Sequence, residues 1–94
     1  MKKLKLLGQK TLQTRNSRSF IVYYYLYMNE EKGIYGIRLE QVDSKNRKIR
    51  EYAEEPGITE SLKVAEDLAG YMMKYEVMPI SLSETIDLYF DERD

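Results

Sequence analysis

The chain has 94 residues, of which 43% are hydrophobic and 33% are charged, a size and composition typical of one folded domain over residues 1–94. Neither cysteine nor histidine occurs, which excludes disulfides, thiolate metal sites, a cysteine nucleophile and the commonest general base. The net charge of −1 hides a division, because residues 1–50 contain 12 Lys and Arg against 4 Asp and Glu, whereas residues 51–94 contain 3 against 12. Such halves either offer a basic surface to an acidic partner or complement each other, within one chain or between two.

A first strand is predicted over residues 2–12, where hydrophobic and polar side chains alternate loosely. Successive side chains of a strand point to opposite faces of its sheet. Leu4 and Leu6 are therefore expected to face the core. Lys3 and Lys5 are then expected on the opposite face.

A second strand is predicted over residues 20–28, which are rich in β-branched and aromatic side chains. Its two faces differ, and the more apolar one is expected to meet the helices. That face carries Phe20, Val22, Tyr24, Leu26 and Met28. The opposite face carries Ile21, Tyr23, Tyr25 and Tyr27.

A third strand is predicted over residues 34–42, and a fourth, more polar one over residues 47–53, as suits the edge of a sheet. Gly36 weakens the third strand unless a bulge or a close neighbour needs the space. Ile49 and Ala53 of the fourth strand are expected to face the core. The third strand is expected to add Tyr35, Ile37 and Leu39 to that face.

After the fourth strand the sequence EPGI, residues 55–58, predicts a type II turn, because Pro and Gly occupy its two central positions. The hydrophobic period then becomes helical. A helix is predicted over residues 59–76, with Thr59 as its N-cap. Its buried stripe is expected to contain Leu62, Ala65, Leu68, Ala69, Met72 and Met73.

The last segment, residues 81–91, is compatible with a strand or a helix, since its hydrophobic residues fit both periods. Ser81 and Glu84 match the spacing of a capping box, and Pro79 fits a break just before it, so a second helix is favoured. The predicted fold class is therefore α+β, with an antiparallel three- or four-stranded meander followed by two helices packed on one sheet face.

One layer of helices covers only one face of a sheet, which leaves the outward tyrosines of the second strand on an open face. The candidate binding surface combines them with three cations: Tyr23, Tyr25, Tyr27, Arg38, Lys48 and Arg50. Four uses are compatible with it: a solvated face, a protein contact such as a homodimer through this face or an edge strand, stacking of nucleic-acid bases, or a small-molecule site. We favour a protein contact, because Tyr and Arg are enriched in interface cores.

Catalysis is not expected from this sequence. Adjacent carboxylates diverge on a helix or strand, and the serines have no histidine base. We predict no catalytic residue, no metal site and no cofactor. Lys5 and Gly8 interrupt the N-terminal apolar run, so no signal peptide is predicted, and no segment reaches the length of a membrane span. We therefore expect a cytoplasmic protein without a membrane partner.

Four features follow one another along the chain: the tyrosine-rich strand with Tyr24-Tyr25-Leu26, the strand with Tyr35-Gly36-Ile37, an amphipathic helix, and VMPISLSETIDLYF at residues 77–90. In this order, over residues 18–92, they resemble a family of small uncharacterised domains from Gram-positive bacteria. The resemblance implies a helix for the last segment and no known activity. The prediction is a non-catalytic accessory or protein-interaction module able to self-associate. The alternative is a protein that binds single-stranded nucleic acid through the tyrosine-rich face.

Overall fold

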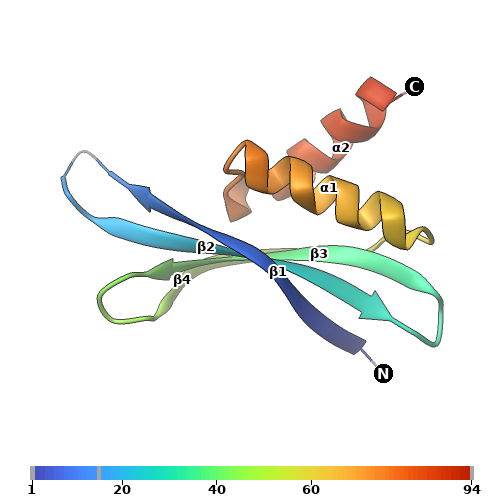
Figure 1. Ribbon diagram of the computed structural model, residues 1–94, viewed down its shortest axis with the longest axis horizontal. Helices are drawn as coiled ribbons and strands as arrows, with labels where there is room; N and C mark the ends of the chain where they lie inside the picture. Colours follow the sequence, from blue (N-terminus) through green and yellow to red (C-terminus); the bar gives the residue numbers. More distant parts are fainter. Residues whose placement is uncertain (1, 15, 94) are drawn as a thin grey trace.

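Four strands and two helices make up the fold in a computed structural model that describes residues 2–14 and 16–93. The elements are β1 (Lys2–Gln13), β2 (Ser19–Asn29), β3 (Ile34–Asp43), β4 (Ile49–Thr59), α1 (Leu62–Lys74), the 3₁₀ turn η1 (Pro79–Ser81) and α2 (Leu82–Arg93). The strands form one antiparallel sheet in the order β1-β2-β3-β4. Both helices lie on one face of this sheet (Figure 1). The predicted α+β meander is confirmed.

The core lies between α1 and the face of the sheet that the helices cover, called here the inner face. The predicted parity of β2 is confirmed, because Val22, Tyr24 and Leu26 are at most 1% exposed. α1 covers the inner face with a buried stripe of small and large apolar side chains, each large one contributing about 1.5–3 kcal/mol when fully buried. The stripe consists of Ala65, Leu68, Ala69 and Met72.

α1 is shorter than predicted and begins with a different cap. Ser61 is the N-cap, and its hydroxyl accepts a hydrogen bond from the backbone N–H of Val64 at 3.2 Å. Thr59 instead ends β4, and its hydroxyl accepts a hydrogen bond from the N–H of Ser61 at 3.1 Å. The prediction of Thr59 as the cap is wrong because the strand continues up to that residue.

The last segment is helical, as predicted, but it does not begin with a capping box. Ser81 lies inside η1, where its backbone N–H donates to the carbonyl of Met78 at 2.9 Å. An N-cap residue has non-helical backbone angles, so Ser81 does not serve as one. α2 contacts α1 through Tyr89, whose ring centroid is 5.2 Å from that of Tyr71. In the described part of the chain, neither helix has the length and apolar character needed to cross a membrane.

β1 contains a bulge at Leu7 that simple alternation does not predict, because the register against β2 shifts directly after Leu6. On the N-terminal side of the bulge, Leu4 lies opposite Tyr27, and Leu6 lies opposite Tyr25. Directly opposed residues of antiparallel strands share a face. Leu4 and Leu6 therefore lie away from the helices, each with 47% of its surface exposed, and the prediction that they face the core is wrong.

The same register places two lysines on the inner side of the sheet, contrary to prediction. Lys3 lies opposite Met28, and Lys5 lies opposite Leu26. The Lys3 ammonium there pairs with Glu30, with 3.1 Å between Nζ and Oε1. These two cations are therefore separated by the sheet from the outward tyrosines of β2.

β4 crosses over Gly36 instead of turning away at residues 55–58. The segment remains part of β4, and Gly57 does not adopt the positive φ that a type II turn requires, so the predicted turn is wrong. The register of β3 and β4 shifts around Gly36, and a Cβ atom there would lie 2.0 Å from the carbonyl oxygen of Glu55. A close backbone neighbour thus explains the glycine inside the strand.

Candidate functional site

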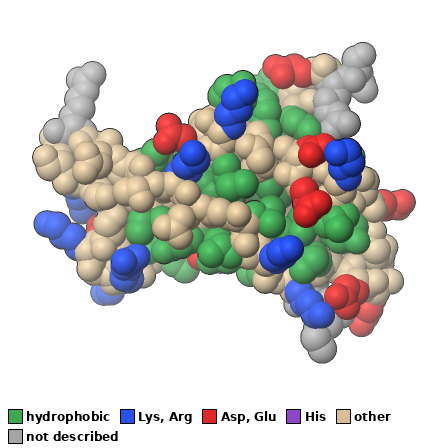
Figure 2. All heavy atoms as spheres, viewed as in Figure 1, with side chains coloured by type: hydrophobic (Ala, Val, Ile, Leu, Met, Phe, Trp, Pro, Cys, Tyr) green, Lys and Arg blue, Asp and Glu red, His purple; other side chains and the backbone are tan. Residues whose placement is uncertain are grey.

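The face of the sheet away from the helices, called here the outer face, gathers apolar side chains from β1, β2 and β4. Those that are not fully buried are Leu4, Leu6, Tyr23, Tyr25, Tyr27, Ile49 and Tyr52. Ile49 and Tyr52 are 50% and 61% exposed, whereas the three tyrosines of β2 are partly buried among their neighbours. Figure 2 shows hydrophobic side chains reaching the surface below β1, on the side of the sheet opposite to the helices.

The tyrosines of β2 form a row along the middle of the outer face. The ring centroids of Tyr23 and Tyr25 are 6.4 Å apart, with the planes tilted by 39°. Tyr25 lies between Leu6 of β1 and Arg38 of β3 in the sheet register. Burial, and then the negative charge of Glu40, raise the pKa of the Tyr25 phenol. The ring therefore stays neutral well into the alkaline range.

Arg38 is the cation at the centre of the outer face, and the protein itself neutralises it. Its Nε atom is 2.9 Å from Oε2 of Glu40, and its Nη1 atom hydrogen-bonds the carboxylate of Glu54. The guanidinium carbon lies 4.3 Å from the ring centroid of Tyr52, in a cation–π contact. Burial alone lowers the pKa of Arg38, but the hydrogen bonds to the two carboxylates outweigh it and raise that pKa.

The other two predicted cations lie away from the tyrosines. β4 starts at Ile49, so Lys48 lies in the turn before it. Arg50 is the extra residue of a second bulge, because the register of β3 and β4 shifts after Ile49, and its Nη1 atom is 3.8 Å from Oδ2 of Asp43. The structure thus brings the three tyrosines together with Arg38 and leaves Lys48 and Arg50 at the β3–β4 hairpin.

Alternation along the chain assigns three residues of the outer face to the wrong side. They are Leu4, Leu6 and Ile49. The bulges at Leu7 and Arg50 each add one residue to a strand, which reverses the parity across that point. The adjacent leucines at positions 6 and 7 break the alternation and signal the first bulge, whereas the polar sequence around Arg50 gives no comparable signal.

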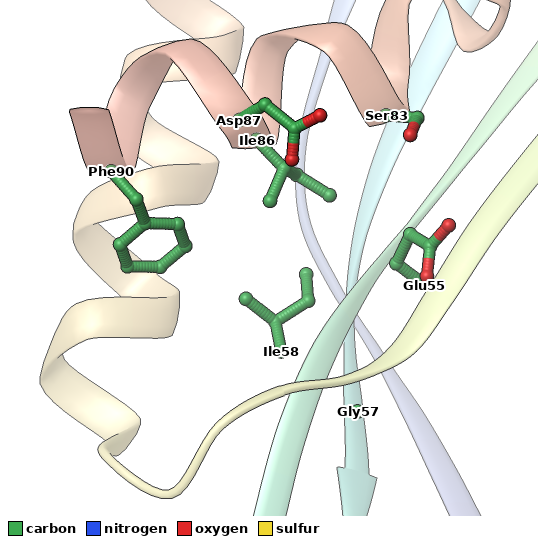
Figure 3. A pocket seen from close by; sticks show the side chains of 7 residues that line it. All are labelled: Glu55, Gly57, Ile58, Ser83, Ile86, Asp87 and Phe90. Atoms are coloured by element: carbon green, nitrogen blue, oxygen red, sulfur yellow. The ribbon is translucent and has the colours of Figure 1, made fainter. Parts of the chain in front are cut away.

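A groove of about 280 Å³ lies between β4 and α2, on the helical side of the molecule. Figure 3 shows Glu55 and Asp87 with their carboxylates at one side of it. Its apolar lining is formed by Ile58, Ile86 and Phe90. Two carboxylates beside an apolar floor suit the aliphatic stem and charged head of a lysine or arginine side chain. Among the described residues, no group of three acidic side chains is arranged to hold a metal ion.

No curated protein and no solved structure matches this chain. A family model described as a family of unknown function (DUF6514) matches residues 3–92, which include nearly all of the sheet and both helices. The resemblance to an uncharacterised family is confirmed to that extent. The chain belongs to this family of unknown function.

Proposed function

We propose that the protein is a non-catalytic, cytoplasmic interaction module that forms a homodimer by packing the outer faces of two copies against each other. The observation that carries this proposal is the outer face itself, where aromatic and aliphatic side chains surround an arginine that carboxylates of the same chain already neutralise. Two sheets pack face to face at a distance of about 10 Å. A second copy would give the outer face the cover that the helices give the inner face.

The size of the outer face supports a dimer. The longest extent of the molecule, 42 Å, follows the strands, and the shortest, 17 Å, runs across them (Figure 1). These two extents enclose roughly 700 Å², close to the ~800 Å² that each partner contributes to a standard protein interface. The apolar side chains come from both edges and the interior of the sheet, so they span its width.

The charges of the outer face favour an identical partner over a nucleic acid. Phosphate binding draws on cations whose charge is not already compensated. Arg38 lies against Glu40 and Glu54, and its side chain is 16% exposed. Stacking of single-stranded bases on the tyrosines, the alternative function, therefore has aromatic rings in its favour, but the charge of Arg38, the cation beside them, is already compensated.

The two edge strands are less suited to self-association than the outer face. β1 places the exposed lysines Lys3 and Lys5 along its length, and β4 carries Glu51, Glu55 and Pro56. Charged side chains and proline typically protect an exposed sheet edge from pairing with another chain. We therefore assign the contact between copies to the outer face.

Light scattering on the wild type and two variants tests this proposal. Leu6→Glu introduces a charge in the outer face at a half-exposed side chain, so the monomer can still fold. Ile80→Glu is the matched control, because Ile80 is 84% exposed and belongs to η1, on the helical side of the molecule. We expect twice the chain mass of 11.2 kDa for the wild type and for Ile80→Glu. Leu6→Glu should have the mass of one chain.

Two results would contradict the proposed dimer. The first is a wild-type protein that has the mass of one chain at every concentration measured. The second is a dimer that persists in Leu6→Glu while circular dichroism shows that the variant is folded. Dissociation of Leu6→Glu with an intact Ile80→Glu dimer would instead locate the contact on the outer face.

A further inference from the structure

The loops of the β1–β2 and β3–β4 hairpins lie at the same end of the sheet, one above the other in Figure 1. The backbone N–H of Ser44 donates to the carbonyl oxygen of Ser19 at 3.1 Å. The hydroxyl of Ser44 also donates to that of Ser19, at 3.0 Å. These bonds join the start of β2 to the residue after β3, so the two loops flank one surface at this end of the sheet.

This surface, called here the basic end, gathers five described cations. They are Arg18, Lys45, Arg47, Lys48 and Arg50. Figure 2 shows Lys and Arg side chains gathered at the left of the molecule, where Figure 1 places both hairpin tips. Asp43 is the one acidic residue within the described parts of residues 14–19 and 43–50, so five positive charges and one negative charge leave a net charge of +4.

Asp43 builds the β3–β4 turn and compensates little of this charge. Its Oδ1 atom accepts hydrogen bonds from the backbone N–H groups of Lys45, at 2.8 Å, and Asn46, at 3.4 Å. The bond from Lys45 is the main cause that lowers the pKa of Asp43, with smaller contributions from Asn46, Arg18 and Arg50. The carboxylate is therefore ionised and already engaged by the turn.

Among the described residues, most cations of the basic end have no ion-pair partner, unlike three cations elsewhere in the fold. Lys3, Arg38 and Lys63 each pair with a carboxylate of the same chain. Within the described ranges, the structure holds no carboxylate at ion-pair distance from four members of the basic end: Arg18, Lys45, Arg47 and Lys48. The basic half of the chain is thus not neutralised at this end by the acidic half.

A hollow of about 320 Å³ lies between the two tips. It is lined by Asn16, Ser17, Arg18, Ser19, Asp43 and Lys45. Two cations and one carboxylate therefore border it. Guanidinium, ammonium, amide and hydroxyl groups are the donors that proteins use on phosphate oxygens. The lining has no aromatic ring on which a base could stack.

We propose that the basic end binds nucleic acid through its phosphodiester backbone, without reading the bases. Four cations on the two loops, together with Arg50 at the start of β4, carry more charge than one small anion neutralises. A nucleic-acid strand instead presents a negative charge at every nucleotide. Arginines form paired hydrogen bonds with phosphate oxygens. The basic end lies at one end of the sheet and does not overlap the outer face, which is assigned to the contact between two copies. The two proposals are therefore independent.

Fluorescence anisotropy with a labelled oligodeoxythymidylate of about 20 nucleotides tests the site, because about four neutralised phosphates predict a defined salt dependence. We expect the affinity to fall about 50-fold between 50 and 200 mM salt, from a slope of about −0.7 per phosphate for single strands. A complete lack of binding at the lower salt concentration overturns the proposal.

Two double variants with the same change in net charge locate the contact. Lys45→Glu with Lys48→Glu alters the basic end and should weaken binding at least tenfold. Lys63→Glu with Lys74→Glu alters α1 instead and should bind like the wild type, with circular dichroism confirming that both variants are folded. Equal losses in the two variants overturn the assignment. Competition by poly-glutamate as strong as that by unlabelled oligonucleotide overturns it too, and assigns the basic end to an acidic protein.

Discussion

The hydroxyl of Tyr24, in the middle of β2, donates a hydrogen bond to the carbonyl oxygen of Val77 at 3.0 Å. Tyr24 is fully buried, and Val77 lies in the segment between α1 and η1, so the bond ties the sheet to the helical layer. We expect Tyr24→Phe to keep the packing of the ring and to lower the free energy of unfolding by about 1–2 kcal/mol. Urea unfolding would measure a lower midpoint with an unchanged slope. An unchanged midpoint would mean that the bond contributes nothing net.

The same tyrosine predicts a dependence of stability on alkaline pH. Burial, followed by the charge of Glu76, raises the pKa of Tyr24 from 10.0 to about 12. The fold favours the neutral phenol, so this stabilisation is complete below the unfolded pKa and is lost as the pH rises through the folded pKa. The difference in the free energy of unfolding between the wild type and Tyr24→Phe should therefore narrow as the pH rises from 10.0 to about 12. Urea midpoints of both proteins at several pH values would show it, and a constant difference would exclude the coupling.

Two serines allow the observed and the predicted helix caps to be compared. Ser61 is the N-cap of α1 in the structure, whereas Ser81 is the N-cap that the sequence predicts for the last helix. Ser61→Ala removes the hydroxyl that accepts from Val64, and we expect it to cost about 1 kcal/mol of stability. Ser81→Ala removes a hydroxyl within η1, a turn without a side-chain cap, and should have a much smaller effect. Thermal unfolding of the two variants compares them directly. The reverse order of effects would support the capping box at Ser81.

The strand β2 and the helix α1 follow from the sequence, because β2 is rich in β-branched and aromatic side chains and α1 has a clear helical stripe. Hydrophobic periodicity alone does not decide between a strand and a helix for α2. The faces of β1 and β4 do not follow from periodicity either. One extra residue, Leu7 or Arg50, reverses the parity across the bulge. Leu4 and Ile49 are therefore misplaced by alternation although a strand is predicted at each of them.

The sequence likewise predicts one part of the candidate site and misses another. The tyrosines of β2 and Arg38 are predicted together because they alternate on two strands that pair. The partnership of Arg38 with Glu54 depends on the register between β3 and β4, which the crossing of β4 over Gly36 helps to set. A sequence pattern shows the charges but not this register, so it cannot show that the charge of Arg38 is already compensated.

Because β4 passes close to Gly36, the small substitution Gly36→Ala is expected to have a large effect on stability. The added Cβ would lie 2.0 Å from the carbonyl oxygen of Glu55 and 2.6 Å from backbone carbons of Pro56. These are backbone atoms, which cannot rotate away as the end of a flexible side chain can. We expect a loss of about 3 kcal/mol or more in the free energy of unfolding, at the upper end of the range for overpacked sites. Urea unfolding monitored by circular dichroism would measure it.

Gly70→Ala is the matched control for this substitution. Gly70 lies within α1, and a Cβ built there meets no atom within 4 Å. Alanine is favoured over glycine in a helix interior by about 0.8–1 kcal/mol, so the same added methyl group should stabilise the protein at this position. Opposite signs for the two variants would tie the loss at Gly36 to the crossing strand. A Gly36→Ala protein as stable as the wild type would mean that β4 does not approach β3 this closely, and the pairing of Glu54 with Arg38 would then need another explanation.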